Sequence, residues 1–280
     1  MRIISSPNQI QKTCLALKRR GKTIAIVPTM GFLHEGHLAL VRKAREVSDI
    51  VVMTIFVNPT QFGPKEAFSK YPRDTKGDLA KARRAGVDFV FLPNVRSIYP
   101  ADYETYVEVT RATRGLCGKS RPVHFRGVTT IVCKLFNIVQ PDFAIFGLKD
   151  FQQCAVIKRM VKDLNLPIQV IGVPTVREKD GLAMSSRNVY LNPSERKAAL
   201  VLSLSLRQIA SEVQKGTRNL AALKRQLVTL IRRELLTRID YVEVMDSETM
   251  QPLKKYRPRK TLFAVAVFIG KTRLIDNRVV

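Results

Sequence analysis

The sequence predicts a doubly wound, parallel (Rossmann-like) α/β sheet followed by a smaller C-terminal α+β domain. Within residues 1–176, short apolar runs alternate with segments of helical periodicity. The runs are apolar at nearly every position, as in residues 50–57, which is typical of parallel strands buried on both faces. After residue 177 the alternation stops, and two long helical patterns precede two strand patterns. This change favours two domains, 1–176 and 177–280.

The elements of the first domain follow from these patterns in chain order. Strands are predicted at residues 23–28, 50–57, 87–92, 142–146 and 168–173. Helices are predicted at residues 6–20, 36–48, 74–85, 127–139 and 150–164. Because ligands of doubly wound sheets bind beyond the carboxyl ends of the strands, we expect the functional site in the loops that follow them.

The C-terminal domain is predicted from capping signals and periodicity. Asn192, Pro193 and Glu195 fit the N-cap, N1 and N3 positions of a helix, which Gly216 ends. A second helix is expected over residues 220–236, and strands over residues 239–245 and 261–269. The charged, glycine-containing segment 177–181 is a candidate hinge between the domains.

The charge balance is strongly basic. Lys and Arg number 48 against 23 Asp and Glu, which gives a net charge of +25. This excess indicates either a polyanionic partner or a general bias toward basic residues. We favour the bias, because the basic residues are spread along the chain and form no single tail.

Cysteine usage and hydropathy suggest where the protein acts. The four cysteines, Cys14, Cys117, Cys133 and Cys154, lie far apart and form no C-x-x-C pair, so reduced thiols are the simplest expectation. The first residues lack the apolar segment of a signal peptide, and no apolar run reaches the roughly 18 residues of a membrane helix. We therefore expect a cytoplasmic protein with no membrane partner.

The clearest candidate site is the junction between strand 23–28 and helix 36–48, where His34 and His37 lie. Three residues apart in the first helical turn, their side chains would share one face. The start of a helix offers backbone N–H groups and positive dipole charge, which suit a phosphate, and imidazole donors would extend such an anion site. Zinc is not expected, because the spacing differs from H-E-x-x-H and no cysteine or third histidine is near in sequence.

Polar residues also follow two other predicted strands, and each group has a structural alternative. Asn58 and Gln61 follow strand 50–57, where ordinary turn chemistry is the favoured interpretation of that loop alone. Gly147, Lys149 and Asp150 follow strand 142–146 and fit a ligand-binding loop and a capped helix about equally well.

Two further segments complete the candidate site. Residues 181–188 offer two serines and an arginine that suit a triphosphate, although an ST-turn loop is the alternative. In residues 121–127, His124 lies between two arginines immediately before a predicted helix, where a charged surface loop is also plausible. Taken together, the loops favour a ligand site at the carboxyl edge of the sheet. A serine hydrolase is not indicated, because G-x-S-x-G is absent.

The same segments resemble a known family. His34-Glu35-Gly36-His37 resembles the HIGH motif of adenylate-forming nucleotidyltransferases, and residues 184–187 resemble their KMSKS loop without its lysines. The ordered set PTMGFLHEGH, FVNPTQF, YPRD, HFRGV, QPDFAIFGLKDFQQ, MSSRN and TRLIDN resembles the pantoate–β-alanine ligase family from about Pro28 to Asn277. Val123 stands where that family often has glycine, but no residue assigned below depends on it.

The resemblance implies a reaction in two steps. The carboxylate of pantoate would attack the α-phosphate of ATP, giving pantoyl adenylate and pyrophosphate. The amine of β-alanine would then attack the activated acyl carbon, releasing pantothenate and AMP. The resemblance also implies Mg²⁺ on the ATP phosphates, a cytoplasmic homodimer, an N-terminal domain for nucleotide and pantoate, and a C-terminal lid.

Residue roles are implied by matching positions. The catalytic candidates are His34, His37 as proton donor, and Lys149. Gln61 and Gln153 would bind pantoate, and Gln61 would also bind β-alanine. ATP would contact Met30, Gly31, Phe32, Leu33, His34, Glu35, Gly36, His37, Gly147, Leu148, Lys149, Asp150, Val176, Met184, Ser185, Ser186 and Arg187. The Mg²⁺ ligands stay open, with Asp74, Asp78 and Asp150 as candidates.

Two other functions compete with this one. One is a nucleotidylyltransferase that stops at the nucleotide adduct. Gln61 and Gln153 argue against it, because as a pair they suit the carboxylate and hydroxyl of a second substrate. A nucleic-acid-binding protein would use the basic surface, but the sequence has no Trp, no basic platform interleaved with aromatic residues and no recognised RNA-binding motif. We therefore expect small-molecule substrates and no nucleic-acid partner.

Overall fold

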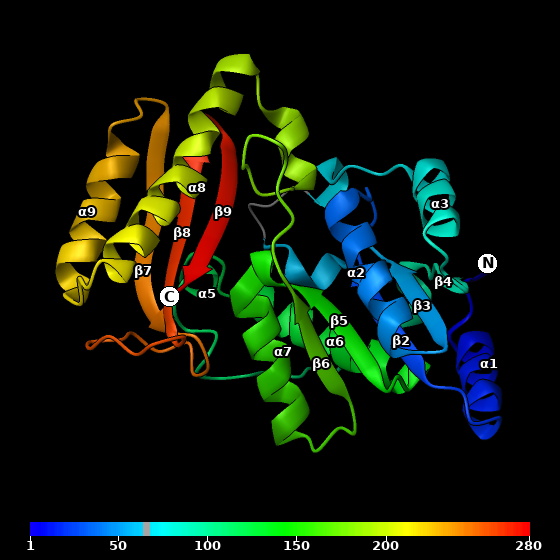
Figure 1. Cartoon of the computed structure of the whole chain (residues 1–280). Helices are drawn as coiled ribbons and strands as arrows, with labels where there is room; N and C mark the ends of the chain where they lie inside the picture. The colour runs from blue at the N-terminus through cyan, green and yellow to red at the C-terminus, as the bar shows by residue number, and fades with distance from the viewer. Residues whose placement is uncertain (64–67) are drawn as a thin grey trace. The chain divides into compact units, whose positions relative to one another are not determined.

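The computed structural model describes residues 1–63 and 68–280, and the chain divides into two compact units (Figure 1). The first unit comprises Met1–Thr110, Arg121–Leu148 and Val156–Pro174. The second comprises Arg111–Ser120, Lys149–Ala155 and Thr175–Val280. Two short segments of the second unit therefore interrupt the first unit in the sequence.

The first unit contains a six-stranded parallel sheet in the order β1-β4-β3-β2-β5-β6. The strands are β1 (Arg2–Ile4), β2 (Ile24–Thr29), β3 (Ile50–Ile55), β4 (Phe89–Phe91), β5 (Phe143–Gly147) and β6 (Gln169–Val173). From β2 the chain proceeds through β3 and β4 toward one side, whereas β5 and β6 lie on the other side of β2. The strand order thus reverses between β2 and β5, which confirms the predicted doubly wound sheet and marks the place where such sheets bind ligands.

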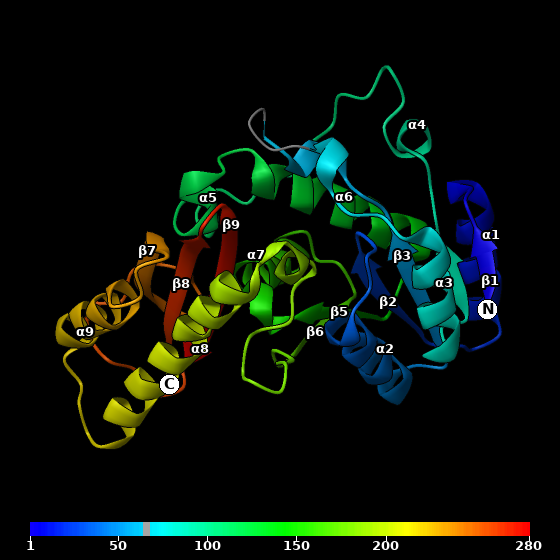
Figure 2. The same cartoon turned by 90° about the horizontal axis from the view of Figure 1, so that it is seen from above.

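Helices cover both faces of this sheet (Figure 2). The helices are α1 (Pro7–Arg19), α2 (Glu35–Val47), α3 (Thr75–Arg84), α4 (Val95–Ile98) and α6 (His124–Val139), with α7 (Phe151–Asp163) starting in the second unit and ending in the first. Ala25 and Val27 pack with Val41 of α2 in one core cluster, while Ile24 and Ile26 alternate toward the opposite face. All four strand residues are fully buried, which explains why the strand sequences are apolar throughout.

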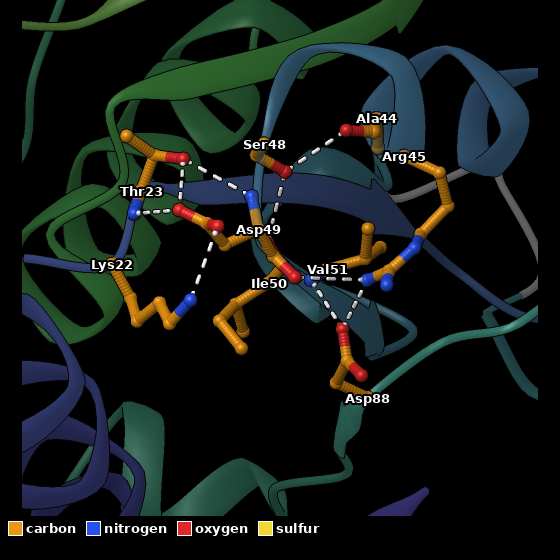
Figure 3. Close-up of polar contacts among 9 residues, drawn as sticks. All are labelled: Lys22, Thr23, Ala44, Arg45, Ser48, Asp49, Ile50, Val51 and Asp88. Atoms are coloured by element: carbon orange, nitrogen blue, oxygen red, sulfur yellow. Dashed lines mark hydrogen bonds and ion pairs between the residues drawn. The ribbon is translucent and has the colours of Figure 1, made fainter.

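The amino edge of the sheet is closed by three aspartates that accept hydrogen bonds from the backbone where strands begin. The bonds run from Thr23 N to Asp49 Oδ2 (2.9 Å), from Ile24 N to Asp142 Oδ2 (2.8 Å) and from Val51 N to Asp88 Oδ2 (2.8 Å). Figure 3 shows the Asp49 and Asp88 contacts. A strand start leaves amides without ladder partners, and the carboxylates supply the missing acceptors.

Each of these aspartates also pairs with a basic side chain. Lys22 lies 3.4 Å from Asp49, Lys18 lies 2.7 Å from Asp142, and Arg45 pairs with Asp88. These three pairs neutralise the carboxylates at this edge one for one and so account for none of the basic excess of the sequence.

The second unit is a small α+β structure, as predicted. Its three-stranded antiparallel sheet has the order β7-β8-β9, formed by β7 (Thr237–Asp246), β8 (Thr261–Ile269) and β9 (Thr272–Val279). The helices α8 (Pro193–Gln214) and α9 (Leu220–Arg232) bury one face each against this sheet, and α5 (Cys117–Ser120) is a single turn. Asn192 and Glu195 form the predicted capping box at the start of α8.

Some boundaries differ from the predictions for identifiable reasons. β9 was not predicted, because its inward positions include Thr272 and Asp276 beside Leu274, so the apolar alternation of a half-buried strand is broken. Helix α6 begins at His124, three residues before the predicted start, so His124 lies in the first turn of a helix and not in a preceding loop. Gly127 therefore lies inside the helix, at the point where α6 packs closely against the backbone of Thr60 and Gln61.

None of the helices in the described part of the chain combines the length and apolar character needed to cross a membrane.

Candidate active site

The turn that joins β2 to α2 has an unusual backbone held by α3. Gly31 and Phe32 both have positive φ, +83° and +51°. The carboxylate of Asp78, which is 1% exposed, accepts hydrogen bonds from Phe32 N (2.8 Å) and Leu33 N (2.7 Å). Lys81 Nζ donates to the carbonyl of Leu33 (2.9 Å). A side chain at position 31 would meet Asp78 Oδ2 at 2.8 Å, so this turn requires glycine both for its φ and for its space.

His34 and His37 begin α2 in an arrangement that fixes their tautomers. His34 is the N-cap and its Nδ1 accepts from Gly36 N (3.1 Å), while His37 Nδ1 accepts from His34 N (3.2 Å). The ring centroids are 4.1 Å apart. A nitrogen that accepts an N–H bond carries no hydrogen, so both neutral rings hold their proton on Nε2. Each ring of the pair therefore carries an N–H at Nε2, the kind of donor that a phosphate oxygen accepts. The phosphate contact itself stays a prediction.

Gln61 lies in a buried 3₁₀ turn, Pro59–Gln61, after β3. Its Nε2 contacts the sulfur of Met30 (3.0 Å), and its Oε1 accepts from Asn58 Nδ2 (3.2 Å). The structure thus brings two residues with different predicted ligands, Gln61 for pantoate and Met30 for ATP, into direct contact. It also shows that Asn58 is more than a turn residue, because its buried amide orients Gln61.

Tyr99 anchors this amide network. Its hydroxyl donates to Asn58 Oδ1 (2.8 Å), the same oxygen that receives the hydroxyl of Thr60 (3.0 Å). Burial raises the pKa of Tyr99 to about 12, so the phenol keeps the proton it donates. Asn58 is then held with its Nδ2 toward Gln61 and the carbonyl of Gly127.

His124 holds the backbone of the same turn from helix α6. Its Nδ1 lies 3.0 Å from the carbonyl oxygen of Gln61, and its Nε2 lies 3.1 Å from Arg121 Nη1. A guanidinium only donates, so Nε2 accepts and Nδ1 carries the hydrogen. His124 therefore has the opposite tautomer to His34 and His37. A Cβ on Gly127 would lie 2.3 Å from the carbonyl oxygen of Thr60, which explains the glycine within α6.

Gly147 ends β5, on the other side of the switch point from the β2 turn, and Leu148 begins the 3₁₀ turn that follows. β5 pairs with β2 through Ala25–Phe143 and Ile26–Ala144, and α2 contacts β5. A Cβ added to Gly147 would have its nearest neighbour at 4.0 Å, in Leu40. A side chain at position 147 would therefore make only ordinary van der Waals contact with α2, and a nucleotide contact at Gly147 stays a prediction.

In the second unit, Lys149 and Asp150 are held by β9. Lys149 Nζ lies 3.2 Å from Asp150 Oδ2, and its side chain is 18% exposed. Asn277 Nδ2 donates to the backbone carbonyl of Lys149 (2.9 Å). Of the two glutamines that follow in α7, Gln152 is buried and bonds three backbone groups of residues 112–117, whereas Gln153 is partly exposed.

The loop that contains Val176 and residues 184–187 is a tight hairpin. Met184 N donates to the carbonyl of Val176 (3.0 Å), which places these two predicted ATP residues side by side. Arg177 makes two bonds to the buried carboxylate of Asp276 (2.7 and 2.9 Å). Ser185 caps the 3₁₀ turn Ser186–Tyr190, and Arg187 is exposed.

A second cluster, at the turn of this hairpin, is centred on Arg196 of α8. Its Nη2 lies 2.8 Å from Glu178 Oε2 and 2.6 Å from Asp180 Oδ2, and Asn188 Nδ2 donates to Glu178 Oε1 (2.7 Å). Asp276 and Arg196 thus fix both ends of the hairpin to the C-terminal fold.

The candidate magnesium ligands do not form a preformed metal site. Within residues 1–63 and 68–280, no group of three or more His, Cys, Asp or Glu side chains is arranged to hold a metal ion. Both oxygens of Asp78 bind backbone amides, and Asp74 Oδ1 accepts from Gly77 N as the N-cap of α3 (2.9 Å).

Sequence reasoning did not single out Asp78 and Tyr99 as parts of this network. An aspartate in the first turn of a helix has the ordinary explanation that it favours the helix dipole, and nothing local shows that it reaches another segment. The signal available was the glycine of PTMGF, which indicates a left-handed turn whose amides need acceptors.

The fold and the polar carboxyl edge define the class of protein. A doubly wound sheet with paired N–H donors at the start of the helix after a central strand is typical of α/β proteins that bind the phosphates of a nucleotide.

Comparison with known proteins identifies the particular family. The chain belongs to the pantoate-beta-alanine ligase family, whose model matches residues 2–279. It is 56% identical over 280 residues to the pantothenate synthetase of Heliobacterium modesticaldum, covering 100% of this chain and 99% of that protein. It is 54% identical to that of Moorella thermoacetica over 277 residues, 99% and 98% of the two chains. The resemblance found in the motifs is confirmed.

Solved structures agree with this assignment. The crystal structure of pantothenate synthetase from Thermus thermophilus matches with a TM-score of 0.94 and 44% identity, covering 100% of this chain and 99% of the other. The pantoate-beta-alanine ligase from Francisella tularensis, complexed with beta-gamma ATP and beta-alanine, matches with a TM-score of 0.79 and 32% identity, covering 100% and 97%.

Proposed function

We propose that this protein joins pantoate and β-alanine to form pantothenate at the expense of ATP, through a pantoyl adenylate. The observation that carries the proposal is that the chain is 56% identical, over its whole length, to the pantothenate synthetase of Heliobacterium modesticaldum. The carboxylate oxygen of pantoate attacks the α-phosphorus, and the bond to pyrophosphate breaks. The amine of β-alanine then attacks the acyl carbon, the bond to AMP breaks, and the amine loses a proton.

The imidazole pair supplies the charge stabilisation for the first step. His34 and His37 each carry hydrogen on Nε2, so they can donate to phosphate oxygens as negative charge builds on departing pyrophosphate. His37 is the proposed proton donor. Lys149 adds a fixed positive charge, and nucleotidyl transfer asks little else of the protein than positioning and charge.

The remaining assignments follow the family resemblance. Gln61 and Gln153 bind pantoate, and Gln61 also contacts β-alanine, consistent with its buried and oriented amide. Nucleotide contacts come from residues 30–37, 147–150, 176 and 184–187. Mg²⁺ would be held mainly through the nucleotide phosphates, with Asp74, Asp78 and Asp150 as the candidate protein ligands, and would supply charge neutralisation there. We also propose a cytoplasmic homodimer, with residues 1–176 binding nucleotide and pantoate and residues 177–280 acting as a lid.

The test is AMP release from ATP and Mg²⁺ with pantoate and β-alanine, omitting each substrate in turn. AMP release that needs both acids, with pantothenate as product, is expected. Pantoate-dependent exchange of pyrophosphate into ATP without pantothenate would limit the activity to adenylate formation. No turnover by folded protein would contradict the proposal.

Lys149→Ala supplies the residue-level test, and Lys158→Ala is a matched control because Lys158 is an exposed lysine of α7. We expect Lys149→Ala to lower kcat on the order of 10²–10³-fold, by analogy with the removal of an oxyanion-hole donor. Lys158→Ala should leave kcat unchanged. Size-exclusion chromatography with light scattering measures the molar mass in solution and so tests the proposed homodimer.

A further inference from the structure

Asp78 and Lys81 are two residues of α3 whose side chains bind backbone groups of the turn between β2 and α2. Asp78 bears a carboxylate, yet its exposed fraction is only 1%. Burying a carboxylate is costly unless several donors meet it. Its two oxygens meet two consecutive backbone amides, Phe32 N and Leu33 N, in the turn that leads into His34.

The backbone of that turn needs such a partner. Gly31 and Phe32 are consecutive residues in the left-handed region, and phenylalanine rarely adopts this conformation. The amides that follow are turned away from the strand ladder, so a carboxylate outside the sheet is their acceptor. Asp78 therefore compensates the strain of the turn as well as satisfying its amides.

One peptide group connects α3 directly to the imidazoles. The carbonyl of Leu33 accepts from Lys81 Nζ (2.9 Å), and the N–H of the same peptide unit, that of His34, donates to His37 Nδ1 (3.2 Å). Because a peptide unit is planar, the bond to Lys81 sets the direction in which the His34 N–H points. A hydrogen bond on the carbonyl also strengthens the bond that the N–H of that unit donates.

We propose that Asp78, assisted by Lys81, is a positioning residue for His34 and His37. It fixes the left-handed turn at residues 31–32 so that both Nδ1 atoms receive backbone amides and both rings carry hydrogen on Nε2. The effect on catalysis relies on the proposed function, whereas the effect on the rings does not.

Asp74 provides the matched control. It lies in the same helix start, and its carboxylate caps α3 by accepting from Gly77 N without contacting the turn. Asp74→Ala therefore weakens α3 locally but leaves residues 31–34 untouched. Asp78→Asn keeps the shape of Asp78 and turns one acceptor into a donor that faces an amide, which leaves one of the two amides unpaired.

The experiment measures imidazole ¹⁵N shifts and kinetics on the full chain. The sequence holds only three histidines, and His124 has hydrogen on Nδ1, so it serves as an internal reference of the other tautomer. We expect Asp78→Asn to move the His34 and His37 shifts toward mixed tautomers with His124 unchanged. Its kcat should fall about 10–100-fold, as for a small misplacement of catalytic groups. Asp74→Ala should leave all three ring shifts unchanged.

Lys81→Met keeps the apolar stem of the side chain and removes only the bond to the carbonyl of Leu33. This variant tests the proposed positioning role if Asp78→Asn does not fold. We expect Lys81→Met to shift the His37 signal and lower kcat less than Asp78→Asn does. The assignment would be overturned if folded Asp78→Asn left the ring shifts unchanged, or if Lys81→Met did so where Asp78→Asn does not fold. It would also be overturned if Asp74→Ala moved the ring shifts as much as Asp78→Asn does. If the wild-type protein makes no pantothenate, the ring shifts alone still distinguish these outcomes.

Discussion

The two edges of the six-stranded sheet both tie side chains to backbone amides, but they do so with different chemistry. At the amino edge, Asp49, Asp88 and Asp142 accept strand amides and pair with cations. At the carboxyl edge, His34 and His37 accept amides through neutral imidazole rings. A carboxylate bound in this way has no hydrogen to donate, whereas an imidazole that accepts at Nδ1 still offers an N–H at Nε2. Side chains at the amino edge therefore only satisfy backbone amides and cations, whereas the imidazoles at the carboxyl edge satisfy amides and also carry the N–H groups that the proposed function directs at phosphates.

The largest expected effect of this difference is in His37→Ala. The variant loses a proposed donor to the phosphates, and kcat should fall on the order of 10²–10³-fold. The lost bond to His34 N is worth only about 0.5–1.5 kcal/mol, so unfolding should change little. AMP release and a urea unfolding curve on the same sample measure both. A loss of stability large enough to explain the loss of activity would contradict the comparison.

Gly127→Ala should affect stability and activity together, because this position supports Gln61 by close packing. The new Cβ would lie 2.3 Å from Thr60 O and 2.5 Å from Gln61 N, so α6 or the 3₁₀ turn must move. Overpacking of this kind costs about 1–3 kcal/mol, which urea unfolding measures. Displacement of Gln61 should raise the KM for pantoate.

Gly63→Ala is the control for this variant, since a Cβ there has its nearest neighbour at 4.0 Å, in Val123. We expect unchanged unfolding and an unchanged KM in Gly63→Ala. If Gly127→Ala also leaves the KM for pantoate unchanged, the contact between α6 and the turn does not position Gln61.

Asp142→Ala should show the opposite signature to His37→Ala. It removes the acceptor of Ile24 N and the partner of Lys18, at a cost of about 1–3 kcal/mol, because a buried amide is left without a partner. Lys18→Met removes the ion pair and the bond from Lys18 Nζ to the exposed carbonyl of Gln140 (3.1 Å), but it keeps the acceptor of Ile24 N. The ion pair is a third exposed and contributes about 1 kcal/mol at most. Urea unfolding of both variants separates the two contributions. Neither variant should change kcat, and a fall in kcat would show that the amino edge also influences the site.

The sequence predicts the fold well where a single local signal decides the structure. Five of the six strands of the first unit were predicted, because residues such as Ile26 and Val52 are apolar on both faces of a parallel strand. The sixth, β1, was not predicted, because its three residues are too short a run to show a pattern. β9 was missed because Asp276 faces inward, where it pairs with Arg177, and that pairing joins residues 99 positions apart. No local pattern carries such information.

The candidate site divides in the same way. His34, His37 and Gln61 follow strands directly, so loop position and residue type were enough to select them. Asn58 seemed to be a turn residue because its role depends on Tyr99, which is 41 residues away. The role of Asp78 likewise depends on its contact with a turn that lies 45 residues earlier in the chain. The residues proposed to contact ligands are thus more visible in a sequence than those that orient them.

The smallest expected effect concerns Asp49 and acid. The hydrogen bond from the Thr23 backbone amide, followed by those from the Thr23 hydroxyl and Lys22, holds the pKa of Asp49 below its ordinary value. A carboxyl group with a depressed folded pKa stabilises the protein above its unfolded pKa of about 3.9, and this contribution is lost as pH falls through the depressed value. Asp49→Asn should therefore lower stability at neutral pH and converge with wild type in acid. Urea midpoints from pH 7 down to about pH 2.5 test this, and the difference should shrink in high salt because the group is exposed. If Asp49→Asn lowers the urea midpoint by the same amount at every pH, then the shape of the Asp49 side chain, and not its charge, stabilises the amino edge.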